Sequence, residues 1–182
     1  HRVTYPANIQ LVAAMNPCRC GMAGEPGHTC ARGPRCRTDY QARISGPLLD
    51  RIDIRIDVPA VQAGDLIRPG VSETSATVAA RVERARRMQR ERYREMGRSD
   101  IRTNSQCSTS LIETVAAPDA GGQSLLSEAA EKLKFSARAY HRILKVARTL
   151  ADLDGADTVG RIHLAEAISY RVASEQTSAV AA

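Results

Sequence analysis

The stretch ARAYHRILKVARTLADL, residues 137–153, repeats apolar side chains every three or four positions. The apolar members are Tyr140, Ile143, Leu144, Ala147, Leu150 and Ala151. That spacing puts them on one face of an α-helix. The stretch therefore predicts a helix over 137–153 that buries this apolar face.

Helical spacing recurs through the second half of the chain. The predicted helices span residues 75–96, 109–116, 124–134 and 137–153, with a last helix after Gly160. Residues 60–74 contain Gly and Pro and are predicted to form a linker. Residues 75–174 are therefore predicted to be an all-helical domain, and the tail 175–182 to be disordered.

The first part of the chain has a different pattern. The apolar run IQLVAAM, residues 9–15, is typical of a buried strand, and residues 52–58 alternate Ile or Val with Asp or Arg at the period of a strand. Residues 16–39, rich in Gly, Pro and Cys, are predicted to be a loop. Because two lone strands do not make a stable sheet, residues 1–59 are predicted to be part of an α/β domain. On this pattern the chain is expected to be a fragment of a longer protein.

Composition narrows the class of protein. A hydrophobic content of 43% and a charged content of 25% are typical of a soluble globular protein. No apolar run approaches the length needed to span a bilayer, and the first residues, HRVTYP, lack signal-peptide character. We therefore expect a cytoplasmic protein without a membrane partner.

Four of the five cysteines, Cys18, Cys20, Cys30 and Cys36, lie within the predicted loop. Four thiolates on one loop can provide the tetrahedral ligand set that structural Zn²⁺ requires, with His28 as a substitute ligand. Two alternatives remain open: reduced cysteines without a metal, or disulfides formed by oxidation. A catalytic cysteine is the weakest interpretation, because no His or Asp stands at a spacing that would indicate a catalytic partner. Cys107 is predicted to be structural.

Three blocks of sequence carry a family resemblance. They are LVAAMNPCRCG, RISGPLLDRIDIRIDVPAV and LKFSARAYHRILKVARTLADLDG. In this order they resemble the magnesium-chelatase-like AAA+ ATPases of the ComM/YifB type, from about Thr4 to Arg171. The resemblance implies the end of a P-loop AAA+ core followed by a helical lid. It also implies ATP and Mg²⁺ as cofactors and a homo-oligomeric ring, expected to be a hexamer. No G-x-x-x-x-G-K-[ST] motif occurs in the chain, so the chain alone is expected to be inactive.

The resemblance assigns roles to three polar side chains. Asn16 matches the sensor 1 position, Arg51 the arginine finger that acts in trans, and Arg138 the sensor 2 arginine. Each has a simpler alternative from the residues alone. Asn16 precedes a proline and is typical of a turn, Arg51 has Asp50 and Asp53 as neighbouring ion-pair partners, and Arg138 is compatible with a surface position. If the family roles hold, the three side chains converge around a triphosphate.

The function implied by the resemblance is DNA remodelling, as in the ComM-type helicases that promote branch migration during transformation. Arg84, Arg87 and Arg94 share a face of the predicted helix over 75–96, so they are candidates for DNA contacts. A solvated helix face or a subunit interface explains the same arginines. Two other functions remain as alternatives: the motor subunit of a magnesium chelatase, which remodels a partner protein, and a non-catalytic zinc module that binds nucleic acid.

Overall fold

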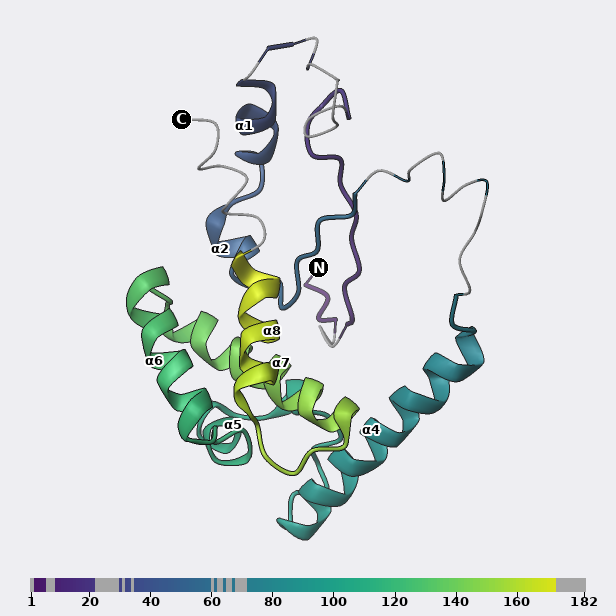
Figure 1. Ribbon diagram of the computed structural model, residues 1–182, viewed down its shortest axis with the longest axis vertical. Coiled ribbons are helices and arrows are strands. Elements are labelled where there is room, and N and C mark those ends of the chain that lie inside the picture. Colours follow the sequence, from purple (N-terminus) through teal and green to yellow (C-terminus); the bar gives the residue numbers. More distant parts are fainter. Residues whose placement is uncertain are drawn as a thin grey trace. The chain divides into compact units, whose positions relative to one another are not determined.

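The structure is a computed structural model, and it describes residues 2–5, 9–21, 30, 32–33, 35–59, 61, 64, 67 and 72–172. The chain forms two compact units, residues 1–45 and residues 46–182. Figure 1 shows the helices of both units. Most of the predicted linker 60–74, and all of the predicted tail 175–182, lie outside the described residues. The predicted domain division at residues 59 and 74 stays a prediction.

All the regular elements among the described residues are helices. The first unit contains α1 (Arg35–Gln41), most of which lies in the range 16–39 predicted to be a loop. The second unit contains α2 (Gly46–Leu49), α4 (Ser75–Glu95), the short 3₁₀ helix η1 (Asn104–Gln106), α5 (Thr109–Val115), α6 (Ala120–Leu133), α7 (Ala137–Asp154) and α8 (Arg161–Val172). The prediction of helices in the second half of the chain is confirmed, with α6 starting four residues earlier than expected.

Helix α7 is the centre of the second unit. Ser136 caps its first turn, because the Ser136 hydroxyl accepts a hydrogen bond from the Ala139 amide at 3.1 Å. Gly155 ends the helix at φ 73°, a left-handed conformation that glycine adopts without a steric cost. Helices α4, α5 and α8 pack against α7, and α6 packs against α8. The sequence at both ends therefore fixes the helix around which the unit is built.

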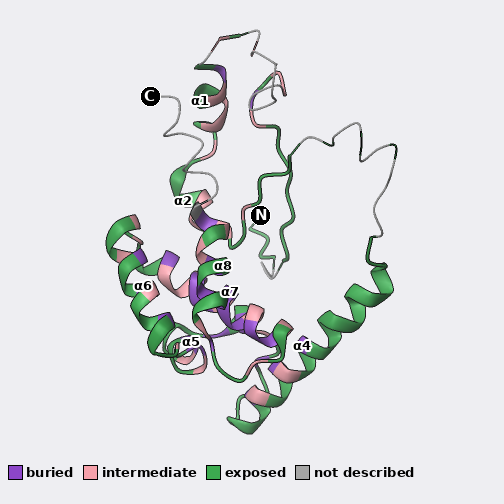
Figure 2. Ribbon diagram, in the orientation of Figure 1, coloured by how far each residue is buried: buried purple, intermediate pink, exposed green. Residues whose placement is uncertain are grey.

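The hydrophobic core lies where these helices meet. Figure 2 shows buried residues concentrated along α7. The side chains that fill the core most completely are Ile112, Leu126, Ile143, Leu144 and Leu164. Full burial of each such side chain contributes about 1.5–3 kcal/mol to folding. The apolar face predicted for residues 137–153 is therefore the face that α7 buries.

The predicted strands over 9–15 and 52–58 are wrong. Across the described residues the structure has no strand, and its β-bridge joins Pro118 to Val159. Both segments lack regular secondary structure and have exposed apolar side chains, such as Val12 and Val58, each 85% exposed. A strand needs a neighbouring strand for its backbone hydrogen bonds, and neither segment pairs with another described segment in this way. The α/β fold class is corrected accordingly to a helical one.

A buried polar network, which the sequence did not predict, joins α4, η1 and α7. The Asp152 carboxylate is 0% exposed and accepts hydrogen bonds from Arg148 Nε at 3.0 Å and Asn104 Nδ2 at 2.8 Å. Both terminal nitrogens of Arg92 on α4 also donate to it. Arg148, 1% exposed, lies one turn before Asp152 on the apolar face of α7. A single buried carboxylate is therefore shared by two guanidinium groups.

The network extends through Tyr93 of α4. Its hydroxyl donates to Asn104 Oδ1 at 2.5 Å and accepts from Cys107 Sγ at 3.0 Å. Burial, together with the hydrogen bond from Cys107, raises the pKa of Tyr93, so the hydroxyl keeps its proton and remains a donor. Cys107 thus has the structural role expected for it.

Replacing Asp152 by Ala is expected to destabilise the helical unit by about 3–5 kcal/mol. The substitution leaves the guanidiniums of Arg92 and Arg148 without their buried counter-charge. The measurement is urea unfolding followed by circular dichroism. The matched control is Glu131→Ala, which removes one exposed carboxylate from α6 and is expected to change the unfolding free energy by less than about 0.5 kcal/mol. Equal losses in the two variants would contradict the network's role.

Candidate metal centre

Two similar turns position three of the four clustered cysteines. In the first, the Gly21 amide donates to the Cys18 carbonyl at 3.1 Å, and in the second the Gly33 amide donates to the Cys30 carbonyl at 2.9 Å. Gly21 and Gly33 have φ values of 83° and 82°, which are left-handed conformations that favour glycine. Each turn therefore depends on a glycine three residues after a cysteine.

Helix α1 provides the fourth cysteine. Cys36 is the second residue of α1, and its amide donates to the Gly33 carbonyl at 3.2 Å, so the second turn leads directly into the helix. Gln41, at the end of α1, donates from Nε2 to the Pro17 carbonyl at 3.3 Å. This contact joins the end of α1 to the residue that precedes the first turn, so it helps to hold Cys36 near the other cysteines.

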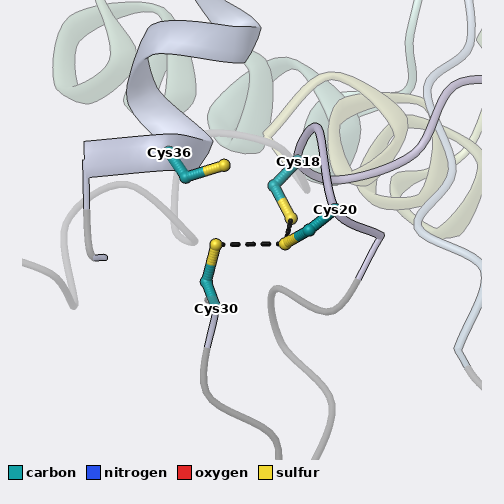
Figure 3. A group of neighbouring side chains, drawn as sticks. All are labelled: Cys18, Cys20, Cys30 and Cys36. Carbon is teal, nitrogen blue, oxygen red and sulfur yellow. Dashed lines mark hydrogen bonds between the residues drawn. The ribbon is translucent and has the colours of Figure 1, made fainter. Parts of the chain in front are cut away.

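The four sulfurs face one another, as Figure 3 shows. All four Sγ atoms lie within 4.8 Å of one another. Cys18 and Cys20 are 3.1 Å apart at sulfur, and Cys20 and Cys30 are 3.0 Å apart. The four cysteines do not form disulfides. The predicted ligands Cys18, Cys20, Cys30 and Cys36 are thus brought together, while His28 lies outside the described residues.

This geometry fits a metal ion with four thiolate ligands. Zinc–sulfur bonds of about 2.3 Å in a tetrahedron place the sulfurs about 3.8 Å apart, within the spread observed here. The hydrogen bond with Cys20 raises the pKa of Cys30 to about 12. A metal cation that binds must displace the thiol protons of the cysteines, because thiolates rather than thiols coordinate metals. The four cysteines therefore form a group that could hold a metal ion.

Asn16 lies in the first unit, directly after residues 9–15 and two residues before Cys18. Its side chain is exposed. The segment before Asn16 was predicted to be a strand and is not one, so Asn16 does not follow a strand in this structure. The sensor 1 assignment stays a prediction and depends on the family resemblance alone.

Arg51 lies in the second unit, just after α2, with an exposed side chain. Its Nη1 donates to the Pro47 carbonyl at 2.6 Å. The carboxylates next to it in sequence pair elsewhere: Asp53 with Arg142 of α7, and Asp50 with α8. The described contacts therefore do not bear out the simpler interpretation of Arg51 as an ion-pair partner of its neighbours.

The coil that follows Arg51 is fastened to α8. Arg171 donates from Nη1 to the Ile52 carbonyl at 3.2 Å and lies 3.4 Å from Asp50 Oδ1. The Arg55 amide donates to the Tyr170 carbonyl at 3.0 Å. Burial lowers the pKa of Arg171, which is nevertheless an arginine and stays charged. Arg51 is therefore carried by the helical unit.

Arg138 is the second residue of α7 and is exposed. It belongs to the second unit, together with Arg51, whereas Asn16 belongs to the first. The position agrees with the predicted first-turn location. Convergence of the three residues around a nucleotide stays a prediction.

Some arginines of α4 form ion pairs, and others are exposed or line a hollow. Arg81 pairs with Glu73, Arg90 with Glu83, and Arg92 with Asp152. The Arg90 guanidinium lowers the pKa of the Glu83 carboxyl through their hydrogen bond. Of the predicted DNA contacts, Arg87 and Arg94 line one shallow hollow of about 310 Å³, together with Arg90 and Glu91. Arg84 is exposed, one turn before Arg87.

A second group of arginines was not predicted. Arg19, Arg32 and Arg43 line a hollow beside Cys36 in the first unit. The sequence carries a signal for it, because arginines alternate with the cysteines in CRC and in CARGPRCR.

Comparison with known proteins identifies the family. Residues 1–66 match the family described as magnesium chelatase, subunit ChlI, and residues 72–171 match its C-terminal family, magnesium chelatase, subunit ChlI C-terminal. The chain is 40% identical over 172 residues to competence protein ComM of Haemophilus influenzae, and 38% identical over 175 residues to the uncharacterized protein YifB of Escherichia coli. Each alignment covers 93% of this chain.

The chain spans about a third of the length of the curated relatives it matches, 32% in both cases. None of the described helices is long and apolar enough to cross a membrane. Because the two matched ranges together cover most of its residues, the chain belongs to the magnesium chelatase ChlI family.

Proposed function

We propose that this chain is the C-terminal part of a ring-forming cytoplasmic AAA+ ATPase, which hydrolyses ATP between subunits and uses the energy to remodel DNA. Membership of the chelatase family and the 40% identity to a competence protein support this proposal. The observation that carries it is the position of Arg51. Its guanidinium is exposed, the coil that follows it is hydrogen-bonded to α8, and its neighbouring carboxylates pair with other residues. The described hydrogen bond of this guanidinium runs to the Pro47 carbonyl, so its neighbouring carboxylates do not compete for it with a nucleotide on another subunit.

The three candidate side chains suit different parts of the reaction. The Asn16 amide carries no charge and can both donate and accept, which suits the orientation of an attacking water. The planar guanidinium of Arg51 suits the charge spread over a phosphoryl transition state. Arg138, at the start of α7, would contact the γ-phosphate in cis, so that binding of ATP changes the position of the helical unit. Mg²⁺ would be held by residues outside this chain.

The four-cysteine group is proposed to hold Zn²⁺ with a structural role. Four thiolates close the coordination shell, which leaves no open position for a substrate or for water. The ion would supply folding energy to the first unit and no catalytic chemistry.

The face of α4 that carries Arg84, Arg87 and Arg94 is proposed to contact DNA phosphates. Arg87 and Arg94 lie together in one hollow, where a single carboxylate, Glu91, opposes them. An excess of exposed guanidiniums along one face can follow a phosphate backbone.

The test of this function is ATP hydrolysis by a longer protein that contains this chain. We expect Mg²⁺-dependent hydrolysis that DNA stimulates, and no hydrolysis by the 182-residue chain alone, which lacks the phosphate-binding G-x-x-x-x-G-K-[ST] motif. Turnover by the chain alone, or a longer protein that binds DNA without hydrolysing ATP, would refute the assignment.

A further inference from the structure

The second arginine hollow lies entirely within the first unit, beside the four cysteines. Its walls are Arg19, Arg32, Cys36, Asp39, Tyr40 and Arg43, around a volume of about 340 Å³. Three guanidinium groups face a single carboxylate, so the hollow has an excess of positive charge. The three arginines are exposed to solvent and Tyr40 is partly exposed. This composition suits an anion with a planar group attached.

The cysteine turns determine where these guanidiniums lie. Arg19 stands between Cys18 and Cys20, and Arg32 lies in the turn that the Gly33 amide closes. Arg43 follows α1, whose first turn carries Cys36. A metal ion that holds the four sulfurs would thereby fix the backbone beneath all three arginines. Binding of an anion would then need little further ordering, which favours affinity.

The chemistry of the hollow favours a phosphodiester chain over an isolated anion. Several guanidiniums at one surface match successive phosphates, and arginine forms paired hydrogen bonds to phosphate oxygens. The Tyr40 ring in the same hollow offers a surface on which an unpaired base can stack. Bases are accessible for stacking in single strands but not in a duplex.

We propose that Arg19, Arg32, Tyr40 and Arg43 form a binding site for single-stranded nucleic acid, and that the metal held by the four cysteines organises this site. The site is distinct from the α4 face and lies in the other unit. It does not depend on ATP hydrolysis, so it stands or falls separately from the proposed function.

The test measures binding of a fluorescein-labelled single-stranded oligonucleotide to the 182-residue chain by anisotropy. The double variant Arg19→Gln/Arg43→Gln is expected to bind about tenfold more weakly. Because two phosphate contacts are lost, the slope of log binding constant against log salt concentration is expected to become shallower by about 1.4. The matched control is Arg2→Gln/Arg35→Gln, which removes two exposed arginines of the same unit outside the hollow. It is expected to bind as the unsubstituted chain does.

Four further measurements test the proposal. Chelation of the metal is expected to weaken binding at least as much as the double variant does, and Tyr40→Leu is expected to weaken binding to the single strand but not to a duplex of equal length. Equal weakening in both double variants would overturn the proposal, because it would reflect net charge alone. Loss of bound zinc from Arg19→Gln/Arg43→Gln would also overturn it, since the arginines would then serve the thiolates. Displacement of the oligonucleotide by ATP at equimolar concentration would reassign the hollow to free nucleotides.

Discussion

Removal of the Zn²⁺ proposed for the four cysteines is expected to unfold the cysteine turns and α1 while the helical unit remains folded. In the first unit, the buried apolar side chains within the described ranges are Cys18 and Cys36. Helix α1 has seven residues, too few to be stable in water by itself. A segment with so little to bury needs another source of stability, and a structural zinc ion supplies about 10–16 kcal/mol of apparent binding free energy at neutral pH.

Hydrogen–deuterium exchange with and without a zinc chelator measures this effect. Amides of α1 are expected to lose their protection on chelation, while those of α7 keep theirs. Two cysteine variants provide a matched pair. Cys36→Ser is expected to lose zinc and α1 protection, whereas Cys107→Ser, in the other unit, is expected to keep one zinc per chain. If α1 stays protected in chelator, the cysteine group is not what stabilises the unit.

The helical half of the fold could be predicted because its signal is local. A repeat of three to four residues specifies a buried face whatever packs against it, so the face of α7 was identified correctly. The strands could not be predicted in the same way. The alternation over 52–58 shows which side chains share a face, but a strand forms only if another strand accepts its hydrogen bonds. Here the described contacts of that segment run instead to α7 and α8, through Asp53 and Arg55.

The same contrast between local and distant sequence signals holds for the buried and clustered polar residues. The four cysteines could be grouped from sequence, because zinc ligands must be near one another and these were close in the chain. The Asp152 network was missed, although Arg148 and Asp152 stand on the apolar face of α7, where charged residues are unexpected. Their partners Arg92 and Asn104 lie some fifty residues away, and no local pattern connects them.

Replacing Arg51 by Ala in a longer protein that contains this chain is expected to lower ATP turnover about 10³-fold or more. An arginine finger stabilises charge that develops on the phosphoryl group in the transition state, and its loss is typically worth 10³–10⁵ in kcat. The matched control is Arg102→Ala, which removes an exposed arginine from the connection between α4 and η1. Its turnover is expected to remain that of the unsubstituted protein.

Mixing subunits tests whether Arg51 acts in trans. An Arg51→Ala subunit keeps Arg138 for its own nucleotide, and an Arg138→Ala subunit keeps Arg51 for its neighbour. In a randomly mixed ring, about a quarter of the head-to-tail interfaces then contain both intact side chains. Partial recovery of turnover on mixing two inactive variants is the expected result, because each complete interface joins residues from different subunits. If Arg51 served the nucleotide of its own subunit, no mixture would restore activity, and the assignment of Arg51 as a finger in trans would be wrong.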